Sequence, residues 1–482
     1  MTNFARGMPK QAPSLGMSFA LLQSKLDLRS PSIPWEKRRE VGKNLRQQCP
    51  RKLHAEWRPA KNRPSPLELI HASNDGRQKE FVPLRMGRMA ATPFTFFRGA
   101  ACVMAYDLSR TPVSGINVLI DGDAHLNNFG LYGTPQREIV FDLNDFDETT
   151  IGPWEWDLKR LVASINLAGR ENGLNRRERA SAVMQCVSGY RTNLERLQSM
   201  GVLDVWYLHA YPGRQNPLRR MDAKTKAILN KSIQKAFQQT NTTLLQKTAE
   251  RDRNGGWSLR ENPPILTSVD DRTRKRIIDS LSDYAKTLSP ERRYMLRRYH
   301  VADVGHRVVG VGSVGTRAYL VLLFGNGDDD PLFLQVKEAI VPAHAPYLPA
   351  LPSEYSHQGK RVVAGERVLQ ASTDVMLGWT EIDGRPFYVR QMKNLKGSVP
   401  VENLTGKPFY FYAWGCGAVL ARAHTRTSDA ALLAGYCGKS DALGNALVQW
   451  AEAYAEQTEA DHAVLVKAIK RGRIRALREP DR

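Results

Sequence analysis

The spacing of apolar residues predicts a chain dominated by helix, with strands confined to two regions. In the first region, a β-branched run at 116–120 and an apolar run at 139–143 predict strands. Apolar residues at helical spacing predict a helix just before them, over 94–108. The pattern is helical with polar faces from about 154 to 300, and helical again over 409–482.

The second strand-rich region lies between residues 301 and 395. Alternating apolar positions predict three strands joined by glycine-rich turns, then a helix, then two more strands. These segments are 304–311, 316–324, 332–337, 357–372, 376–382 and 386–392. The expected fold class is therefore α+β, with a helical part encoded before a β-rich part.

Both ends of the chain are strongly basic. Residues 1–64 hold 14 Lys and Arg against four Asp and Glu, and residues 467–482 hold seven against two, so the ends carry most of the net charge of +21. Within the first segment, residues 1–35 are expected to be poorly ordered, 36–48 to form a short basic helix, and 58–66 to be an extended, proline-rich connector. Basic ends attract nucleic acid, anionic lipid or an acidic partner. No nucleic-acid-binding motif accompanies them, and a solvated surface explains them as well.

The amino-acid composition favours a globular protein and argues against disulfide-rich and membrane-spanning classes. The 482 residues are 42% hydrophobic and 25% charged, which is ordinary for a globular protein of two to four structural units. The five cysteines contain no CxxC pair, which argues against a disulfide framework or a cysteine-rich zinc site and favours a reducing compartment. No apolar run of about 18 residues and no secretory signal is present. We expect a cytoplasmic protein without a membrane span.

Acidic and amide side chains gather after the first predicted strand. Asp123 and Asn128 have the spacing D-x-x-x-x-N of the protein-kinase catalytic loop, in which Asp accepts the hydroxyl proton and Asn holds a metal. Asp145, followed by Phe146 and Asp147, stands where a kinase-like Asp-Phe-Gly places its metal-binding Asp. From this spacing we predict that Asp123 is catalytic. Since Mg²⁺ takes oxygen ligands, we predict that Asn128 and Asp145 bind magnesium.

Several assignments around this loop stay open. The sequence does not decide which of Asp142, Asp145 and Asp147 binds the metal. Asp147 and Glu148 could instead cap turns, or cap the helix that begins near residue 153. All these acids could also serve a metal-dependent hydrolase without any nucleotide.

Two further residues extend the similarity to kinases. Sugar and aminoglycoside kinase-like loops follow the pattern H-G-D-x-H-x-x-N, which this chain matches at Gly122, Asp123, His125 and Asn128, with Asp121 in place of the first histidine. We include His125 with the catalytic residues, as an organiser of the loop rather than a metal ligand. Asp157 resembles the buried aspartate by which the following helix hydrogen-bonds such a loop.

A glycine-rich turn and a lysine form the second motif. The turn GVGSVG contributes Gly310, Gly312, Ser313 and Gly315, and it lies between two predicted strands, which excludes a Rossmann unit and matches the phosphate-covering loop of kinases. Lys337 on the next strand is placed to pair with the phosphates. We therefore predict these residues to bind ATP. An ordinary β-meander with turn glycines and a surface lysine is the alternative.

Kinases also pair that lysine with a glutamate from the following helix. Here the candidate is Glu366, with Glu354 just before the helix, and neither spacing is decisive. The order of the motifs is also reversed, because the glycine-rich turn follows the acidic loop. A circularly permuted kinase-like fold accounts for this order, since permutation is tolerated when the joined ends lie at the surface.

The predicted organisation follows from this permuted order. It comprises a basic extension (1–66), a mostly helical large-lobe region with the catalytic loop (67–300), a β-rich nucleotide-binding region (301–395) and a helical end packing on the large lobe (396–482). In the last region His424 is expected to be a packed or capping histidine rather than a ligand.

The chain resembles a bacterial family known as domain of unknown function 2252. The matching strings include RMAATPFTFFRGAACVMAYDL, GDAHLNNFG, FDLNDFDET, GPWEWDLKRL, VVGVGSVGTRAYLVLL, LQVKEA and LARAHTR, and the resemblance runs from about residue 45 to 426. It implies a bacterial cytosolic protein built as one integrated unit. It implies no particular reaction.

Three functions are consistent with these patterns. The first is an ATP- and Mg²⁺-dependent phosphotransferase, or a nucleotidyl transferase, acting on an unknown acceptor. The second is an inactive nucleotide-binding regulatory module whose basic ends engage a partner. The third is the metal-dependent hydrolase that uses the acids of residues 123–147 alone.

Overall fold

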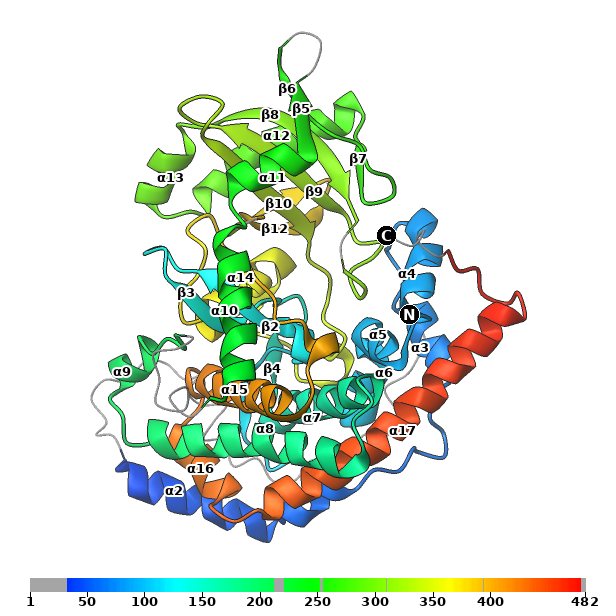
Figure 1. The fold of residues 1–482 in the computed structure, drawn as a ribbon, viewed down its shortest axis with the longest axis vertical. Coiled ribbons are helices and arrows are strands. Elements are labelled where there is room, and N and C mark those ends of the chain that lie inside the picture. The colour runs from blue at the N-terminus through cyan, green and yellow to red at the C-terminus, as the bar shows by residue number, and fades with distance from the viewer. Residues whose placement is uncertain (1–32, 212–220, 252–254, 309, 393, 478–482) are drawn as a thin grey trace.

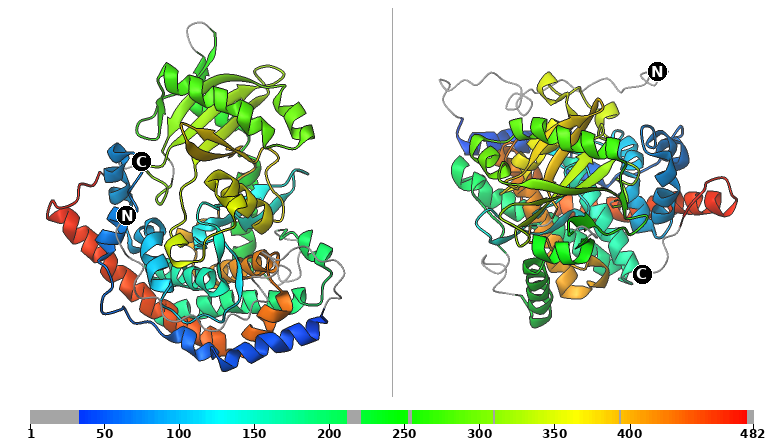
Figure 2. Two further views of the ribbon diagram at one scale, coloured as in Figure 1. Left: turned by 180° about the vertical axis from the view of Figure 1, so that it is seen from behind. Right: turned by 90° about the horizontal axis from the view of Figure 1, so that it is seen from above.

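The computed structural model describes residues 33–211, 221–251, 255–308, 310–392 and 394–477, and its fold is of the α+β class (Figure 1). The expectation for residues 1–35 therefore falls almost entirely outside the described residues. A β-rich part lies at one end of the molecule and a larger helical part at the other (Figures 1 and 2). Among the described residues, no helix is both long and apolar enough to cross a membrane.

The β-rich part is built on one antiparallel sheet of six strands, in the order β11-β12-β10-β9-β8-β7. The strands are β7 Leu266–Ser268, β8 His300–Arg307, β9 Ala318–Phe324, β10 Pro331–Glu338, β11 Gly378–Ile382 and β12 Arg385–Gln391. Helix α14 (Gln358–Leu369) comes between β10 and β11. The expected succession of three strands, a helix and two strands is confirmed.

Helices cover both faces of this sheet. Helix α12 (Asp271–Lys286) packs Ile277 and Tyr284 against one face, and α11 (Asn241–Thr248) packs leucines against the other. Residues alternate along β9, since Val321 joins the first cluster and Leu322 the second. A strand covered on both faces has no polar side, which explains the unbroken apolar sequence of β9.

The stretch 154–300 is not entirely helical, contrary to expectation. It contains the hairpin of β5 (Ala249–Arg251) and β6 (Trp257–Leu259) as well as β7. Helix α13 (Pro290–Leu296) follows α12. These strands are only three residues long, too short for an alternating pattern to stand out from the helical background.

The helical part is built around a few long helices. They are α7 Trp154–Glu171, α8 Arg176–Leu197, α15 Gly406–Thr425, α16 Ala430–Cys437 and α17 Ala442–Lys470. Helix α10 (Ala223–Phe237) stands between the sheet and α15 (Figure 1). The helix expected over 94–108 is two helices, α5 (Pro93–Gly99) and α6 (Ala101–Leu108), because the backbone of Ala100 leaves the helical region at φ −111° and ψ 41°.

Two short two-stranded ribbons lie within the helical part and carry the acidic residues. Strand β1 (Asn117–Ile120) pairs with β4 (Thr150–Pro153), and β2 (Phe129–Gly133) pairs with β3 (Ile139–Leu143). The predicted strands at 116–120 and 139–143 are confirmed.

The described part of the basic N-terminal segment is bound to the body of the protein. Helix α2 (Trp35–Asn44) lies along α16, and Arg39 forms an ion pair with Glu195 of α8 at 2.6 Å. Arg63 is held between Asp107 and Asp461 at 2.7 and 2.6 Å. Helices α3 (Pro66–Ala72) and α4 (Val82–Met89) follow. Much of the positive charge in residues 33–66 is therefore used inside the molecule.

Glycines allow α8 and α15 to approach each other closely. A Cβ added to Gly417 would lie 2.0 Å from the carbonyl oxygen of Cys186, and one added to Gly189 would lie 2.1 Å from that of Trp414. Backbone atoms cannot yield as a flexible side chain does, so any larger residue forces the two helices apart.

We predict that Gly417→Ala lowers the free energy of unfolding by about 1–3 kcal/mol, the usual cost of overpacking. Gly415→Ala, two residues earlier, is the control, since its new Cβ would meet only Phe141 at 3.6 Å. The control should be neutral or up to about 1 kcal/mol more stable, because alanine favours helix. Urea unfolding of both variants measures the difference, and equal midpoints would contradict the close helix contact.

Candidate functional site

The two ribbons bring the predicted acids and amide together. Residues 121–128 connect β1 to β2, and pairing of Phe129 with Leu143 places Asn128 beside the end of β3. The amide nitrogen of Asn128 donates to the backbone oxygens of Asp123 and Asp145 at 3.2 and 3.1 Å. It also donates to the carboxylate of Asp121 at 3.1 Å. No hydrogen bond to its amide oxygen is seen within the described residues.

Asp123 is held by an arginine that the sequence analysis did not identify. The Nε of Arg160, on α7, donates to Oδ1 of Asp123 at 2.5 Å, and its Nη2 donates to the carbonyl of Phe97 at 3.1 Å. Burial raises the pKa of Asp123 to about 7 against the opposing charge of Arg160, with the nearby Glu148 contributing. A signal was available, since Arg160 follows Asp157 by three residues and so shares its helix face.

His125 is buried in the same loop as a neutral imidazole. Burial, together with the charges of Arg98 and Arg160, holds its pKa well below its ordinary value. Its Nε2 lies 3.7 Å from Asp123, and its backbone N–H donates to the carbonyl of Asp123 at 2.7 Å. These contacts fit a residue that shapes the loop. Its Nδ1 is buried without a partner in the described part of the chain.

Asp157 fixes the start of the loop from helix α7. Its carboxylate accepts from the backbone N–H groups of Asp121 and Gly122 at 2.7 and 2.9 Å. His424 lies 3.1 Å from the same carboxylate and 2.9 Å from the hydroxyl of Tyr190. Asp157 thus makes the contact expected of it, and His424 is a packed, hydrogen-bonded histidine, as expected.

Lys337 reaches the acidic loop from the sheet. Its ammonium is bonded to Asp147, 190 residues away in sequence, and its side chain is 3% exposed. Although burial opposes it, the carboxylates of Asp145 and Asp147 hold the pKa of Lys337 above its ordinary value. Asp145 also contributes to the raised pKa of Asp123, so Asp145 lies close to both Lys337 and Asp123.

Asp145 is an ionised carboxylate surrounded by cations. Burial raises its pKa, but the charges of Lys337, Arg390 and Lys396 outweigh this and lower it below the ordinary value. Its Oδ1, like Oδ1 of Asp147, is buried without a hydrogen-bond partner among the described residues. Such orphaned oxygens are costly unless a ligand or ion completes them.

Glu366, on α14, does not pair with Lys337. It lies 3.6 Å from Arg390, and burial raises its pKa to about 7 against the charges of Arg390 and Lys396. Lys337 takes Asp147 as its partner instead. The sequence analysis had left Asp147 open between a capping residue and a metal ligand, so it missed this ion pair.

The glycine-rich turn is anchored by its carbonyl oxygens to the segment before α4 and to α4 itself. Arg88 donates to the oxygen of Gly310 at 2.5 Å, and the backbone N–H of Gln78 donates to that of Gly315 at 2.8 Å. Gly310 and Gly315 have φ of +66° and +88°, which favours glycine. A Cβ on Gly312 would lie 3.2 Å from the carbonyl oxygen of Arg98, and Ser313 lies in the same turn.

Arg98 connects this turn to the acids. Burial lowers its pKa, and the carboxylates of Asp123 and Asp145 act against that shift, so its guanidinium lies near both. The predicted glycine-rich turn, lysine and acidic loop therefore meet in one region, with Arg98 between the turn and the loop.

Asp142 faces away from this region. Its carboxylate is bonded to Arg422 of α15 and accepts from the backbone N–H groups of Leu143 and Ala371 at 2.9 Å each. With its oxygens used by these donors, Asp142 is the least suited of the three aspartates to hold a metal.

The protein oxygens of this region suit a metal ion whose coordination shell is completed by a bound ligand. Among the described residues, no group of three or more His, Cys, Asp or Glu side chains is arranged to hold a metal. The free oxygens of Asp145 and Asn128 fit Mg²⁺, which commonly uses one or two protein oxygens together with phosphates and water.

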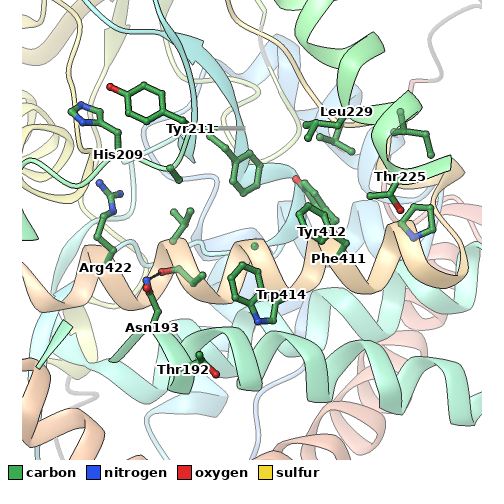
Figure 3. Close-up of a pocket in the computed structure, with 18 of the residues that line it drawn as sticks. Thr192, Asn193, His209, Tyr211, Thr225, Leu229, Phe411, Tyr412, Trp414 and Arg422 are labelled. Atoms are coloured by element: carbon green, nitrogen blue, oxygen red, sulfur yellow. Dashed lines mark hydrogen bonds between the residues drawn. The ribbon is translucent and has the colours of Figure 1, made fainter. Parts of the chain in front are cut away.

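A large apolar pocket of about 650 Å³ lies elsewhere, between α8, α10 and α15 (Figure 3). Phe141 and Tyr412 belong to its wall, and the hydroxyl of Tyr412 donates to the carbonyl of Leu126 in the acidic loop at 2.8 Å. None of the predicted site residues lines it. No pattern in the sequence had indicated this pocket, because its walls come from segments distant in the chain.

Comparison with known families identifies the family to which the chain belongs. Residues 77–468 match the family described as "Uncharacterized protein conserved in bacteria (DUF2252)". The protein belongs to this family, which confirms the resemblance seen in its motifs. No curated protein and no solved structure matches the chain.

We predict that Asp157→Asn destabilises the protein by about 1.5–3 kcal/mol, because hydrogen bonds to a buried charge are lost. The same change at Asp441 is the control, since that carboxylate is 69% exposed and pairs with Arg191 at 3.2 Å. Exposed pairs contribute about 0–1 kcal/mol. Chemical denaturation compares the two variants, and a loss at Asp157 no larger than at Asp441 would show that Asp157 does not hold the loop.

Proposed function

We propose that the protein is a permuted kinase-like phosphotransferase that uses ATP and Mg²⁺ to modify an acceptor not yet identified. The observation that carries the proposal is the bond between Lys337 and Asp147, with Asp145 beside it. The proposal is supported by the acidic loop and the lysine at this pair and by Arg98, which links the glycine-rich turn to the loop, although these motifs are far apart in the sequence.

Each lobe of such an enzyme has a counterpart here. The six-stranded sheet with α14 corresponds to the small lobe, and the helical part with the acidic loop to the large lobe. The contact of Asp157 with the loop backbone is the one expected from the helix that follows a kinase catalytic loop. The reversed order along the chain is what a permutation produces.

The residues then take the following roles. Lys337 binds the phosphates of ATP, exchanging Asp147 for a phosphate oxygen as its partner. The glycine-rich turn, held by its carbonyl oxygens, offers backbone N–H groups to the phosphates. Asn128 and Asp145 hold Mg²⁺, which neutralises charge on the transferred phosphoryl group. Asp123 orients the acceptor hydroxyl and takes its proton, and Arg160 positions Asp123.

The partner of the glutamate on helix α14 differs from that in kinases. Glu366 pairs with Arg390, which lies 3.1 Å from the carbonyl of Asn144 and close to Asp145. Glu366 of helix α14 is therefore linked to Asp145 through Arg390 and not through Lys337. Asp145 and Asp147 are the carboxylates that favour the charged form of Lys337.

We predict that Mg²⁺ and ATP together raise the melting temperature, because a ligand that binds only the folded state stabilises it. Asp145→Asn should remove the magnesium-dependent part of this shift. Lys337→Met should weaken ATP binding about tenfold or more, since the phosphates lose a charged partner. Thermal unfolding with and without Mg²⁺ measures the melting-temperature shift, and calorimetric titration with ATP measures the affinity.

Two controls keep this test interpretable. Lys275→Met removes an exposed lysine of α12, 77% exposed, and should leave ATP binding unchanged. The double variant Lys337→Met with Asp147→Asn avoids an unpaired buried carboxylate if the single variant is unstable. ATP affinity equal to that of the unaltered protein in both Lys337 variants would remove Lys337 from the nucleotide site.

We predict that Asp123→Asn lowers phosphoryl transfer by about 10²–10⁴-fold while ATP binding stays nearly unchanged, because Asp123 faces the acceptor. Transfer from labelled ATP to a mixture of hydroxyl-bearing metabolites and proteins provides the measurement. Asp279→Asn, on the exposed side of α12, is the control. Full activity of the Asp123 variant would contradict its role, and ATP binding without any transfer by the unaltered protein would favour a regulatory module.

A further inference from the structure

The pocket between α8, α10 and α15 has the features of a small-molecule site. Its volume of about 650 Å³ lies in the range of about 300–1,000 Å³ typical of ligand pockets. Its wall is largely apolar and aromatic. The main apolar contributors are Phe141, Leu208, Ile228, Leu229, Val399, Phe411, Tyr412, Trp414 and Val419.

The wall carries two arginines, Arg196 and Arg422. His209 lines the pocket as well, and no Asp or Glu is among its described lining residues. Arg422 projects from α15 toward His209 at one end of the cavity, while Leu229 of α10 lies toward the other end (Figure 3). The cavity therefore has a basic end and an apolar body.

Arg422 has hydrogen-bond donors that no described residue satisfies. Its side chain is 3% exposed, and only its Nη2 is used, donating to Asp142 and to the carbonyl oxygen of Leu369 at 3.0 Å. Its Nε and Nη1 are buried without a hydrogen-bond partner in the described part of the structure. Since buried donors are almost always paired, an acceptor brought next to Arg422 from the pocket would satisfy them.

We propose that this pocket binds a free organic acid with an apolar body, such as a medium-chain fatty acid. The apolar part lies among Phe141, Leu229 and Tyr412, where it is removed from water. The carboxylate accepts from Arg422, and Arg196 at the exposed edge adds a second positive charge. This proposal is independent of the phosphotransferase activity, since none of the proposed catalytic residues lines the pocket.

Titration calorimetry of the full chain with decanoate and with 1-decanol tests the proposal. The two probes share one chain length and differ in the carboxylate. Decanoate should bind with a stoichiometry of one and at least about tenfold more tightly than 1-decanol, the margin expected for a charge-assisted hydrogen bond. Binding of 1-decanol equal to that of decanoate, or no binding of decanoate, would overturn the proposal.

Three variants locate the binding. Leu229→Trp fills the apolar end and leaves Arg422 and Asp142 untouched, so it should abolish decanoate binding. Arg422→Gln should weaken decanoate about tenfold or more and 1-decanol little, and Arg196→Gln should do the same to a smaller degree. If Arg422→Gln does not fold, the other two variants still decide the question. Unchanged decanoate affinity in Leu229→Trp would place the binding elsewhere and refute the pocket.

Discussion

The ion pair between Lys337, which is buried, and Asp147, whose side chain is 22% exposed, joins the two halves of this protein. One partner comes from the central strands of the sheet and the other from the ribbon end beside α7, so the pair fixes the sheet over the acidic loop. Breaking a buried pair leaves an uncompensated charge, which is far more costly than losing an exposed pair. The pair acts together with hydrogen bonds from Arg361 and Arg390 to the backbone of residues 144–149, so the β-rich part is held against the acidic loop at several points.

The acidic loop is stable only because cations from distant segments surround it. Arg160 of α7 holds Asp123, and Arg390 of β12 and Lys396 act on Asp145. Asp121 has no ion pair with a cation in the part of the chain that the structure describes, and burial and the neighbouring carboxylates raise its pKa well above the ordinary value. Clustered carboxylates at separations of a few ångströms cannot all ionise without such compensation. The same arrangement keeps a strong negative centre next to a lysine, which is suited to phosphate and a divalent cation.

Five of the six strands of the sheet could be predicted because each is long enough to show its pattern, as β9 and β10 are, whereas β7 has only three residues and was missed. The acids Asp123 and Asp145 could be singled out because a short motif carries them. The partner of Lys337 could not, since Asp147 is a common turn residue and nothing local marks a contact over 190 residues. Arg390 was missed for the same reason, because burial of a charge is a property of the folded state and not of the segment. Arg160 could have been found from its spacing to Asp157 on the same helix face.

Helix α15 is shared by the acidic loop and the apolar pocket. Tyr412 lines the pocket with its ring and donates its hydroxyl to the loop carbonyls of Leu126 and Phe129 at 2.8 and 3.1 Å. Arg422, ten residues along the same helix, holds Asp142 on β3, the strand that ends two residues before Asp145. A ligand that reorders either side chain acts on the ribbon that carries both proposed metal ligands. The pocket and the acidic loop are thus in contact with the same strand, β3. A ligand in one site influences the other if it binds two conformations of that strand with different affinities.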